Sequence, residues 1–186
     1  MSINPVLGAA KADFFRYCII YKRGGIYLDL KSFIKIPNLF GNIIQSEDEA
    51  ILDIRRDNKE PYRKVWGYGS YEQWFLVYKP GHPYLEKMIN TMTRFINQRI
   101  EFELDNSAKV VKQQVLRLTG PDCYSLAIHE AILQHGKHHR ELSYFKWLRY
   151  RIDRTSEYKH LNLVHYSDQT HSSLYDINRK PFTHRE

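Results

Sequence analysis

The sequence predicts a single α/β domain, and three observations lead to that fold class. Helical and extended patterns alternate along the chain, as in folds that pack helices against a sheet. At 186 residues, the chain is long enough to bury a substantial core in one domain. It has no internal repeat, low-complexity tract or linker. We therefore expect residues 1–186 to form one domain.

The first element is a helix over residues 4–21. Asn4 is a suitable N-cap, and Pro5 fits the first helical position. The double glycine Gly24-Gly25 ends the helix, because glycine accepts the left-handed conformation that a helix C-terminus requires. Apolar residues recur at helical spacing between these signals, at Ala9, Ala12, Phe15, Ile19 and Ile20.

The double glycine leads into a strand over residues 26–30, which carries Asp29 near its end. The Thr-Gly-Pro turn at residues 119–121 places Pro121 at the start of a helix that ends at Gly136. Further helices are predicted over residues 82–97 and 123–135. Further strands or extended segments are predicted over residues 33–36, 49–54, 73–78, 142–145 and 161–166.

The charge of the chain indicates anionic ligands without naming them. The formal net charge is +7 and the isoelectric point is near 9.3. Nucleotide diphosphates, acidic membrane surfaces and nucleic acids would all fit this charge. The basic residues are scattered except in residues 135–140 and 149–154, which we interpret as solvated faces, so no nucleic-acid partner is expected. No signal peptide or membrane-length apolar run is visible, and we expect a cytoplasmic location.

Four residues of the first helix and strand are candidates for a ligand site. Asp13 and Arg16 are three residues apart and share one helix face. Asp29 lies near a strand end, where α/β folds bind ligands, and Tyr27 precedes it by two residues. A carboxylate beside a guanidinium can hold paired hydroxyls while its charge is compensated. An Asp–Arg pair alone is often a simple helix contact, but the joint pattern favours a sugar-nucleotide site.

A resemblance to a known family rests on three segments. Residues 10–17 followed by residues 24–29 resemble the DXD sugar-binding region of family 32 glycosyltransferases, and the motif region extends over residues 9–36. That family includes fungal initiating and sphingolipid mannosyltransferases, and clostridial glucosylating toxins share the motif. Residues 73–83 are similar to a Gln-Trp strand followed by Pro-Gly-His-Pro, and residues 119–121 resemble the later Thr-Gly-Pro turn.

The resemblance implies a nucleotide-sugar-binding fold of the DXD type (type A). It also implies transfer of a hexose from a UDP- or GDP-sugar to an acceptor hydroxyl, with retention of configuration. Asp13 and Arg16 would bind the hydroxyls of the donor sugar, and Tyr27 would pack near the ribose and diphosphate. Asp29 would be the first acid of the motif, touching the ribose or sugar and, through water, a metal.

The chain departs from the family pattern at Lys31, where the second acid normally ligates Mn²⁺ or Mg²⁺. Three hypotheses remain open. Lys31 could neutralise the diphosphate leaving group and make the metal unnecessary, the hypothesis we favour. The protein could instead have lost transfer activity and bind carbohydrate or a protein partner. Asp29 could also hold a metal together with a late residue.

The position of the motif near residue 1 is a second departure. Members of the family usually carry a preceding segment with the strand that binds the nucleotide base. We therefore expect the first βαβ portion of the fold to be lacking here. A truncated product, a split gene, or a partner chain that supplies the missing portion would each account for this.

Several later residues are also candidates for the site. Asp122 is a candidate contact to the acceptor or sugar. His165 and, more weakly, His171 correspond to a late histidine that contacts the metal or diphosphate in related enzymes, although the tryptophan that follows it there is missing. The histidine-rich residues 135–140 are expected to form a solvated loop rather than a metal cluster. Cys123 has no evident His or Asn partner that would make it a nucleophile.

Overall fold

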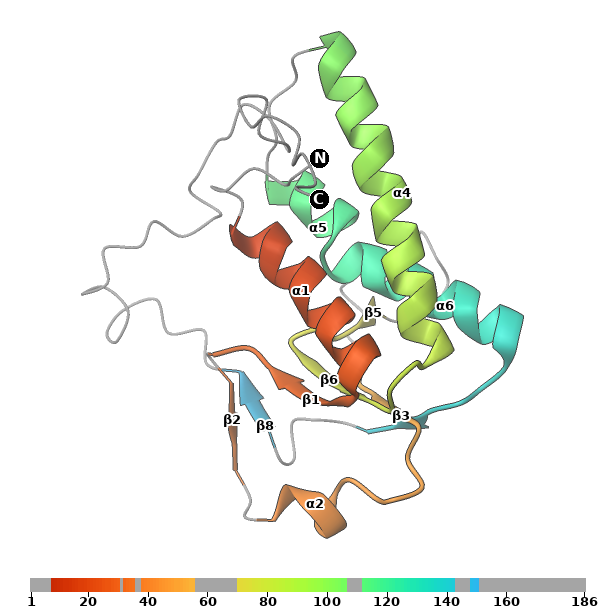
Figure 1. Cartoon of the computed structure of the whole chain (residues 1–186). Coiled ribbons are helices and arrows are strands. Elements are labelled where there is room, and N and C mark those ends of the chain that lie inside the picture. The colour runs from red at the N-terminus through yellow and green to blue at the C-terminus, as the bar shows by residue number, and fades with distance from the viewer. Residues whose placement is uncertain are drawn as a thin grey trace, which may run out of the picture.

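A mixed four-stranded sheet with helices packed against it confirms the predicted α/β class (Figure 1). The computed structural model describes residues 8–30, 32–35, 38–55, 70–106, 112–142 and 148–150. Its helices are α1 (Gly8–Arg23), α2 (Leu39–Asn42), α4 (Pro83–Asn106), α5 (Lys112–Leu118) and α6 (Pro121–His135). Its strands are β1 (Gly25–Leu28), β2 (Ser32–Ile34), β3 (Ala50–Leu52), β4 (Ile54–Arg55), β5 (Ser70–Tyr71), β6 (Phe75–Tyr78), β7 (Arg140–Glu141) and β8 (Leu148–Tyr150).

The sheet has the order β1-β6-β3-β7, and its strand directions determine which loops meet. Strand β6 is antiparallel to both β1 and β3, and β3 is parallel to β7. Strands β1, β3 and β7 therefore run in the same direction, and β6 runs opposite to them. The carboxyl end of β1, at Asp29, thus lies at the same edge of the sheet as Trp74, which precedes β6.

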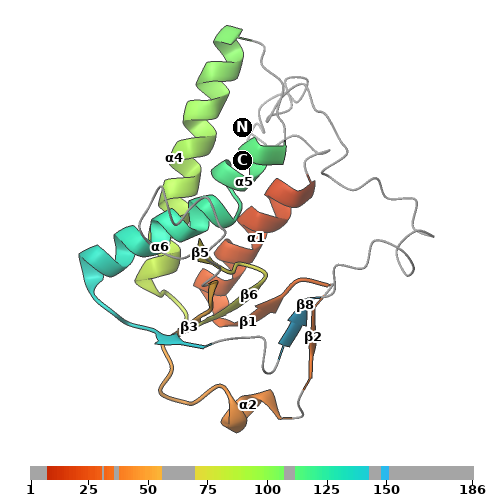
Figure 2. The same ribbon diagram turned by 180° about the vertical axis from the view of Figure 1, so that it is seen from behind.

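Both faces of the sheet are covered, so consecutive residues of β6 are all buried. Leu76 and Tyr78 pack into the larger cluster with α1, α4 and α6. Phe75 and Val77 point to the opposite face, where they join a smaller cluster with residues Ile43 and Ile44. Figures 1 and 2 show α1, α4 and α6 together on one side of the sheet and α2 on the other.

The turn between α1 and β1 is tied to the turn between β6 and α4. Gly24 has a φ of +65°, and its N–H donates to the carbonyl of Ile20 at 2.7 Å. The N–H of Gly81 donates to the carbonyl of Tyr21 at 2.7 Å. A Cβ atom at Gly24 would lie 2.6 Å from Cδ of Pro80. These contacts fix the direction in which the chain leaves α1 and begins β1. They therefore also fix the position of Asp29 relative to the helix.

The predicted elements agree with the structure in part. The first helix and the helix that Pro121 opens are confirmed. The strand predicted over residues 26–30 is found as β1, which ends at Leu28, so Asp29 lies directly after the strand rather than within it. The predicted strand over residues 49–54 is interrupted at Asp53, between β3 and β4. The N-cap at Asn4 and the strand over residues 161–166 lie outside the described residues.

Other elements differ from the prediction or were not predicted. Helix α4 continues to Asn106, nine residues beyond the predicted end, because no glycine or proline interrupts residues 98–106. The strand predicted over residues 142–145 is found earlier, as β7 at Arg140–Glu141; Leu142 is not in a strand, and residues 143–145 lie outside the described part. Helices α2 and α5 and strands β5 and β8 were not predicted. Within the described ranges, no helix is both long enough and apolar enough to cross a membrane.

Candidate functional site

Helix α1 presents an acid, a base and a tyrosine on its buried face. Asp13, Arg16 and Tyr17 occupy positions i, i+3 and i+4, which share one side of an α-helix. Asp13 is 5% exposed, Arg16 is 6% exposed and Tyr17 is fully buried. Two opposite charges thus face the protein interior rather than solvent, and such burial is tolerated when the charges are paired and hydrogen-bonded.

The guanidinium of Arg16 joins the helix to the edge of the sheet. Its Nη2 lies 3.0 Å from Oδ1 of Asp13, and its Nη1 lies 3.3 Å from Oδ1 of Asp29. Nη1 also donates to the backbone carbonyl of Gln73 at 3.1 Å. Burial acts against the charge, but the neighbouring carboxylates outweigh it and raise the pKa of Arg16 above its usual value. Arg16 is therefore a permanent cation between two acids.

Asp29 is held by its backbone and by its side chain. Its N–H donates to the carbonyl of Trp74 at 2.9 Å, and its carbonyl accepts from the N–H of Ser32 at 2.8 Å. Its Oδ1 accepts a hydrogen bond from the Tyr27 hydroxyl at 2.9 Å. The Asp29 side chain is 23% exposed, against 7% for the side chain of Asp13. Asp29 is thus the more accessible of the two acids that contact Arg16.

Asp13 is satisfied within the protein. Its Oδ1 faces Arg16, and its Oδ2 accepts a hydrogen bond from the Thr119 hydroxyl at 2.9 Å. Burial raises the pKa of Asp13 to about 7, although Arg16 and Thr119 both act to lower it; the nearby charge of Asp29 also raises it. Both oxygens of this carboxylate therefore have partners before any ligand is considered.

The structure brings together the four residues that the sequence predicted for the donor site: Asp13, Arg16, Tyr27 and Asp29. It also adds three that the sequence analysis did not assign. The Tyr17 hydroxyl donates to the side-chain oxygen of Gln73 and lies 3.4 Å from the carbonyl of Thr119. Gln73 and Thr119 begin the second and third segments that carry the family resemblance, which is the signal that could have identified them.

The other predicted site residues have different outcomes. Asp122 lies in the first turn of α6 and is half-buried, three residues after Thr119. Lys31, His165 and His171 lie outside the described residues. Cys123 is buried, and burial raises the pKa of its thiol to about 12, so it is not an activated nucleophile.

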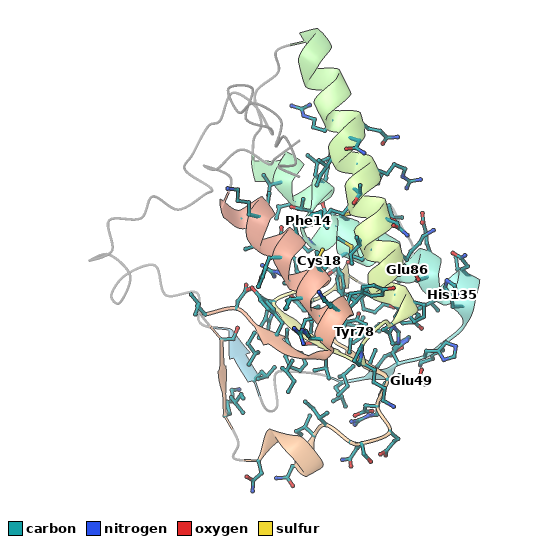
Figure 3. All side chains as sticks on the ribbon, in the orientation of Figure 1. Phe14, Cys18, Glu49, Tyr78, Glu86 and His135 are labelled. Carbon is teal, nitrogen blue, oxygen red and sulfur yellow. The ribbon has the colours of Figure 1, made fainter. Side chains whose placement is uncertain are left out.

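The prediction of a solvated loop over residues 135–140 is wrong for two residues, His139 and Arg140. Arg140 begins β7, and its guanidinium pairs with Asp48. The ring of His139 is buried, with a side-chain exposure of 1%, and its Nδ1 lies 3.1 Å from the Tyr84 hydroxyl. Its burial lowers its pKa, although Glu141 acts to raise it. His135, Lys137 and His138 are exposed, as predicted. In Figure 3, His135 lies at the end of α6 and Glu49 lies just before β3.

The described side chains do not fit a metal ion at Asp29. No group of three or more His, Cys, Asp and Glu in the described part of the chain is placed to hold one. Oδ1 of Asp29 already accepts from Tyr27, and the Arg16 cation lies 3.3 Å away. A second cation at that oxygen would be repelled by Arg16.

Comparison with known proteins shows which family the segment around Asp13, Arg16, Tyr27 and Asp29 resembles. Residues 4–51 match the family model described as "Glycosyltransferase sugar-binding region containing DXD motif". The chain is related to the DXD glycosyltransferases. The matched residues include all four members of the site, and the resemblance inferred from the sequence is confirmed. The DXD glycosyltransferases commonly use divalent metals. The positive charge of Lys31 is therefore the main chemical difference between this chain and the family pattern.

Three curated fungal relatives are similar over part of their length. The chain is 31% identical over 97 residues to "Putative glycosyltransferase HOC1" of Saccharomyces cerevisiae, covering 48% of this chain and 24% of that protein. It is 31% identical over 135 residues to "Initiation-specific alpha-1,6-mannosyltransferase" of Schizosaccharomyces pombe, covering 67% and 31%. The Candida albicans protein of the same name is 27% identical over 134 residues, covering 64% and 34%. The chain thus spans about a third or less of the length of these relatives.

A solved structure titled "PaToxG Glycosyltransferase" is similar to 67% of this chain and 36% of its own, with a TM-score of 0.46 and 17% sequence identity.

Proposed function

We propose that this chain transfers a hexose from a nucleotide-sugar donor to an acceptor hydroxyl, with retention of configuration. One observation carries the proposal: Arg16 bridges Asp13 and Asp29 beside Tyr27, inside the segment that matches the sugar-binding family model. The names of the Schizosaccharomyces pombe and Candida albicans relatives, both mannosyltransferases, support sugar transfer and a nucleotide-sugar donor.

The exposure of the four side chains suggests a separate role for each in donor binding. Asp29, the more accessible acid, would accept hydroxyls of the ribose or donor sugar, because an ionised carboxylate is an acceptor only. Tyr27 would pack against the nucleotide with its half-buried ring. Arg16 would orient Asp29 and place positive charge where the diphosphate departs. Asp13 would mainly hold Arg16, since both of its oxygens already have partners.

We further propose that side-chain cations balance the charge of the leaving diphosphate. Arg16 is one of them, and Lys31, two positions after Asp29 in the sequence, is the other. A positioned cation in a partly desolvated site stabilises a developing anion strongly. No step of the proposed reaction is routed through a metal, because the described residues around Asp29 do not fit one.

Calorimetric titration with UDP- and GDP-hexoses, first with Mn²⁺ and then with EDTA, tests the proposal. We expect micromolar to millimolar binding of at least one donor that survives EDTA, and slow hydrolysis of the same donor. Asp29→Asn should weaken that binding at least about tenfold, since a charged hydrogen bond is worth roughly 1.5–3 kcal/mol. Glu86→Gln is the matched control, because Glu86 is an exposed acid on α4.

The possible results separate the alternatives. Binding lost with EDTA would contradict the cation proposal and support a metal held with Asp29. Binding without hydrolysis or transfer to any acceptor would favour a carbohydrate-binding or partner-binding role over catalysis. A chain that binds none of the donors would contradict the proposed function.

A further inference from the structure

Thr119 reaches the site from a distant part of the chain. Its side chain is fully buried, and its hydroxyl donates to Oδ2 of Asp13 at 2.9 Å, across 106 positions in sequence. The carbonyl of Val115 lies 3.3 Å from the same hydroxyl, so it is the more distant of the two acceptors. A hydroxyl has a single proton to donate, and the shorter distance favours the carboxylate.

The backbone around Thr119 leaves it little freedom to move. Its N–H donates to the carbonyl of Val115 at 3.0 Å, and the N–H of Gly120 donates to the same carbonyl at 3.1 Å. A Cβ atom at Gly120 would lie 2.7 Å from Cα of Leu116, so the turn packs directly on α5. Pro121 then starts α6. The Thr119 hydroxyl is therefore presented from a rigid junction between two helices.

From Thr119, an unbroken series of contacts leads to the accessible acid. The hydroxyl holds one oxygen of Asp13, and the other oxygen of Asp13 holds Nη2 of Arg16. The opposite nitrogen of that planar guanidinium, Nη1, contacts Oδ1 of Asp29. Because both oxygens of Asp13 are engaged, rotation of its carboxylate would break one contact or the other. Thr119 thus fixes the plane in which Arg16 is held.

We propose that Thr119 is a positioning residue of the proposed transferase site, which acts on Asp29 through Asp13 and Arg16 without touching the donor. The inference rests on the proposed function, and it assigns a role to the Thr-Gly-Pro segment. Catalysis depends on geometry at the scale of tenths of an ångström, so a loosened guanidinium would reduce turnover more than it reduces stability.

Two substitutions at position 119 and a matched control test this role. Thr119→Val keeps the shape and removes the hydroxyl, whereas Thr119→Ser keeps the hydroxyl. Thr91→Val is the control, because Thr91 is a 3%-exposed threonine on α4 that belongs to none of the site contacts described above. We expect Thr119→Val to lower kcat for donor hydrolysis about tenfold, with Thr119→Ser within about twofold of the wild type and Thr91→Val unchanged.

Thermal unfolding of the same variants separates positioning from a general structural role. Thr119→Val should lower the melting temperature more than Thr91→Val, because it also leaves Oδ2 of Asp13 without its donor, so kcat is compared at a temperature at which both variants are folded. Equal kcat values for Thr119→Val and Thr91→Val would overturn the proposal. So would a Thr119→Ser variant that is as impaired as Thr119→Val.

A measurement that needs no donor keeps this inference separate from the proposed function. In urea unfolding, Thr119→Val and Asp13→Asn form a double-mutant cycle, and we expect a coupling of about fivefold in the unfolding equilibrium constant. If the wild type binds no donor, the proposed function fails, and this coupling alone decides whether Thr119 holds Asp13. Additive effects of the two substitutions would overturn the inference even in an active protein.

Discussion

The guanidinium carbon of Arg16 lies 4.7 Å from the centroid of the Tyr27 ring, and the two side chains share one oxygen of Asp29. A cation over an aromatic face is stabilised by roughly 0.5–2 kcal/mol, depending on its desolvation. The ring thus supports Arg16 from one side while its hydroxyl orients the acid. Tyr27 lies in β1 and Asp29 directly follows this strand, so one short segment supplies both partners of the helix arginine.

Arg16→Ala should abolish donor binding and destabilise the fold. Removal of one partner from a buried ion pair costs about 3–5 kcal/mol, because the remaining charge is left uncompensated. Donor titration and urea unfolding measure the two effects. In an Arg16→Ala, Asp13→Asn double variant, part of the stability should return while donor binding stays lost. Unchanged donor turnover in Arg16→Ala would contradict the site assignment.

Tyr27→Phe should have a mild effect on stability and a larger one on the donor. The substitution keeps the ring beneath Arg16 and removes the hydrogen bond to Asp29, worth about 1–3 kcal/mol. We expect donor affinity to fall several-fold, measured by calorimetry. Tyr21→Phe is the control, since Tyr21 is also half-buried on α1 and its hydroxyl has no partner in the described part of the chain. Equal affinities for the two variants would show that the Tyr27 hydroxyl does not act on Asp29.

Gly24→Ala should destabilise the protein, and Gly8→Ala should not. At Gly24 the φ of +65° and the 2.6 Å approach of Pro80 both oppose a methyl group, which we expect to cost about 2–4 kcal/mol. Gly8 lies in the helix α1 with nothing within 4 Å of its Cβ position, so alanine there should be neutral or stabilising. Denaturant unfolding compares the two. A Gly24→Ala variant as stable as the wild type would show that the two turns are not tightly packed.

Asp13 should make the stability fall as the pH rises from about 4 to 7. Burial raises its pKa to about 7 in the folded state, from a usual value of 3.8. Between these values the folded state binds the extra proton, so the free energy of unfolding decreases with pH, by at most about 4 kcal/mol over the whole window. Urea titrations at pH 5 and pH 7 measure this difference. Asp13→Asn should reduce it, and a slope that this variant leaves unchanged would assign it to other groups.

Lys31→Asp should convert the site to metal dependence. The substitution restores the second acid of the motif and removes the cation that we propose for the diphosphate. Donor binding in EDTA should therefore weaken at least about tenfold, because a charge is reversed beside an anionic group. Added Mn²⁺ should restore it. If the wild type is inert and only this variant hydrolyses donors with Mn²⁺, the chain is a transferase that has lost its chemistry.

The sequence predicted the four central residues because their placement depends on local rules. Helical periodicity puts Asp13 and Arg16 on one face, and a double glycine ends the helix just before the strand that carries Tyr27 and leads to Asp29. Such signals lie within a few residues of one another. The roles of these residues in donor binding remain predictions.

The partners that hold the site could not be predicted in the same way. Tyr17 meets Gln73 across 56 positions and Thr119 meets Asp13 across 106, and a buried hydroxyl or amide has no periodic signal of its own. Strand order is also non-local: β6 lies between β1 and β3, although it follows both in sequence. The burial of His139 likewise depends on Tyr84, which is far away in the chain.

The close packing of Gly24 on Pro80 has an evolutionary consequence. Any side chain at position 24 would meet both the ring and the backbone nitrogen of Pro80, so position 24 cannot change while the turn at Pro80 stays in place. Among homologues, the two turns should therefore covary, and a chimaera that exchanges only one of them between distant relatives should fold poorly. The site would then be inherited as a pair of turns rather than as a single motif.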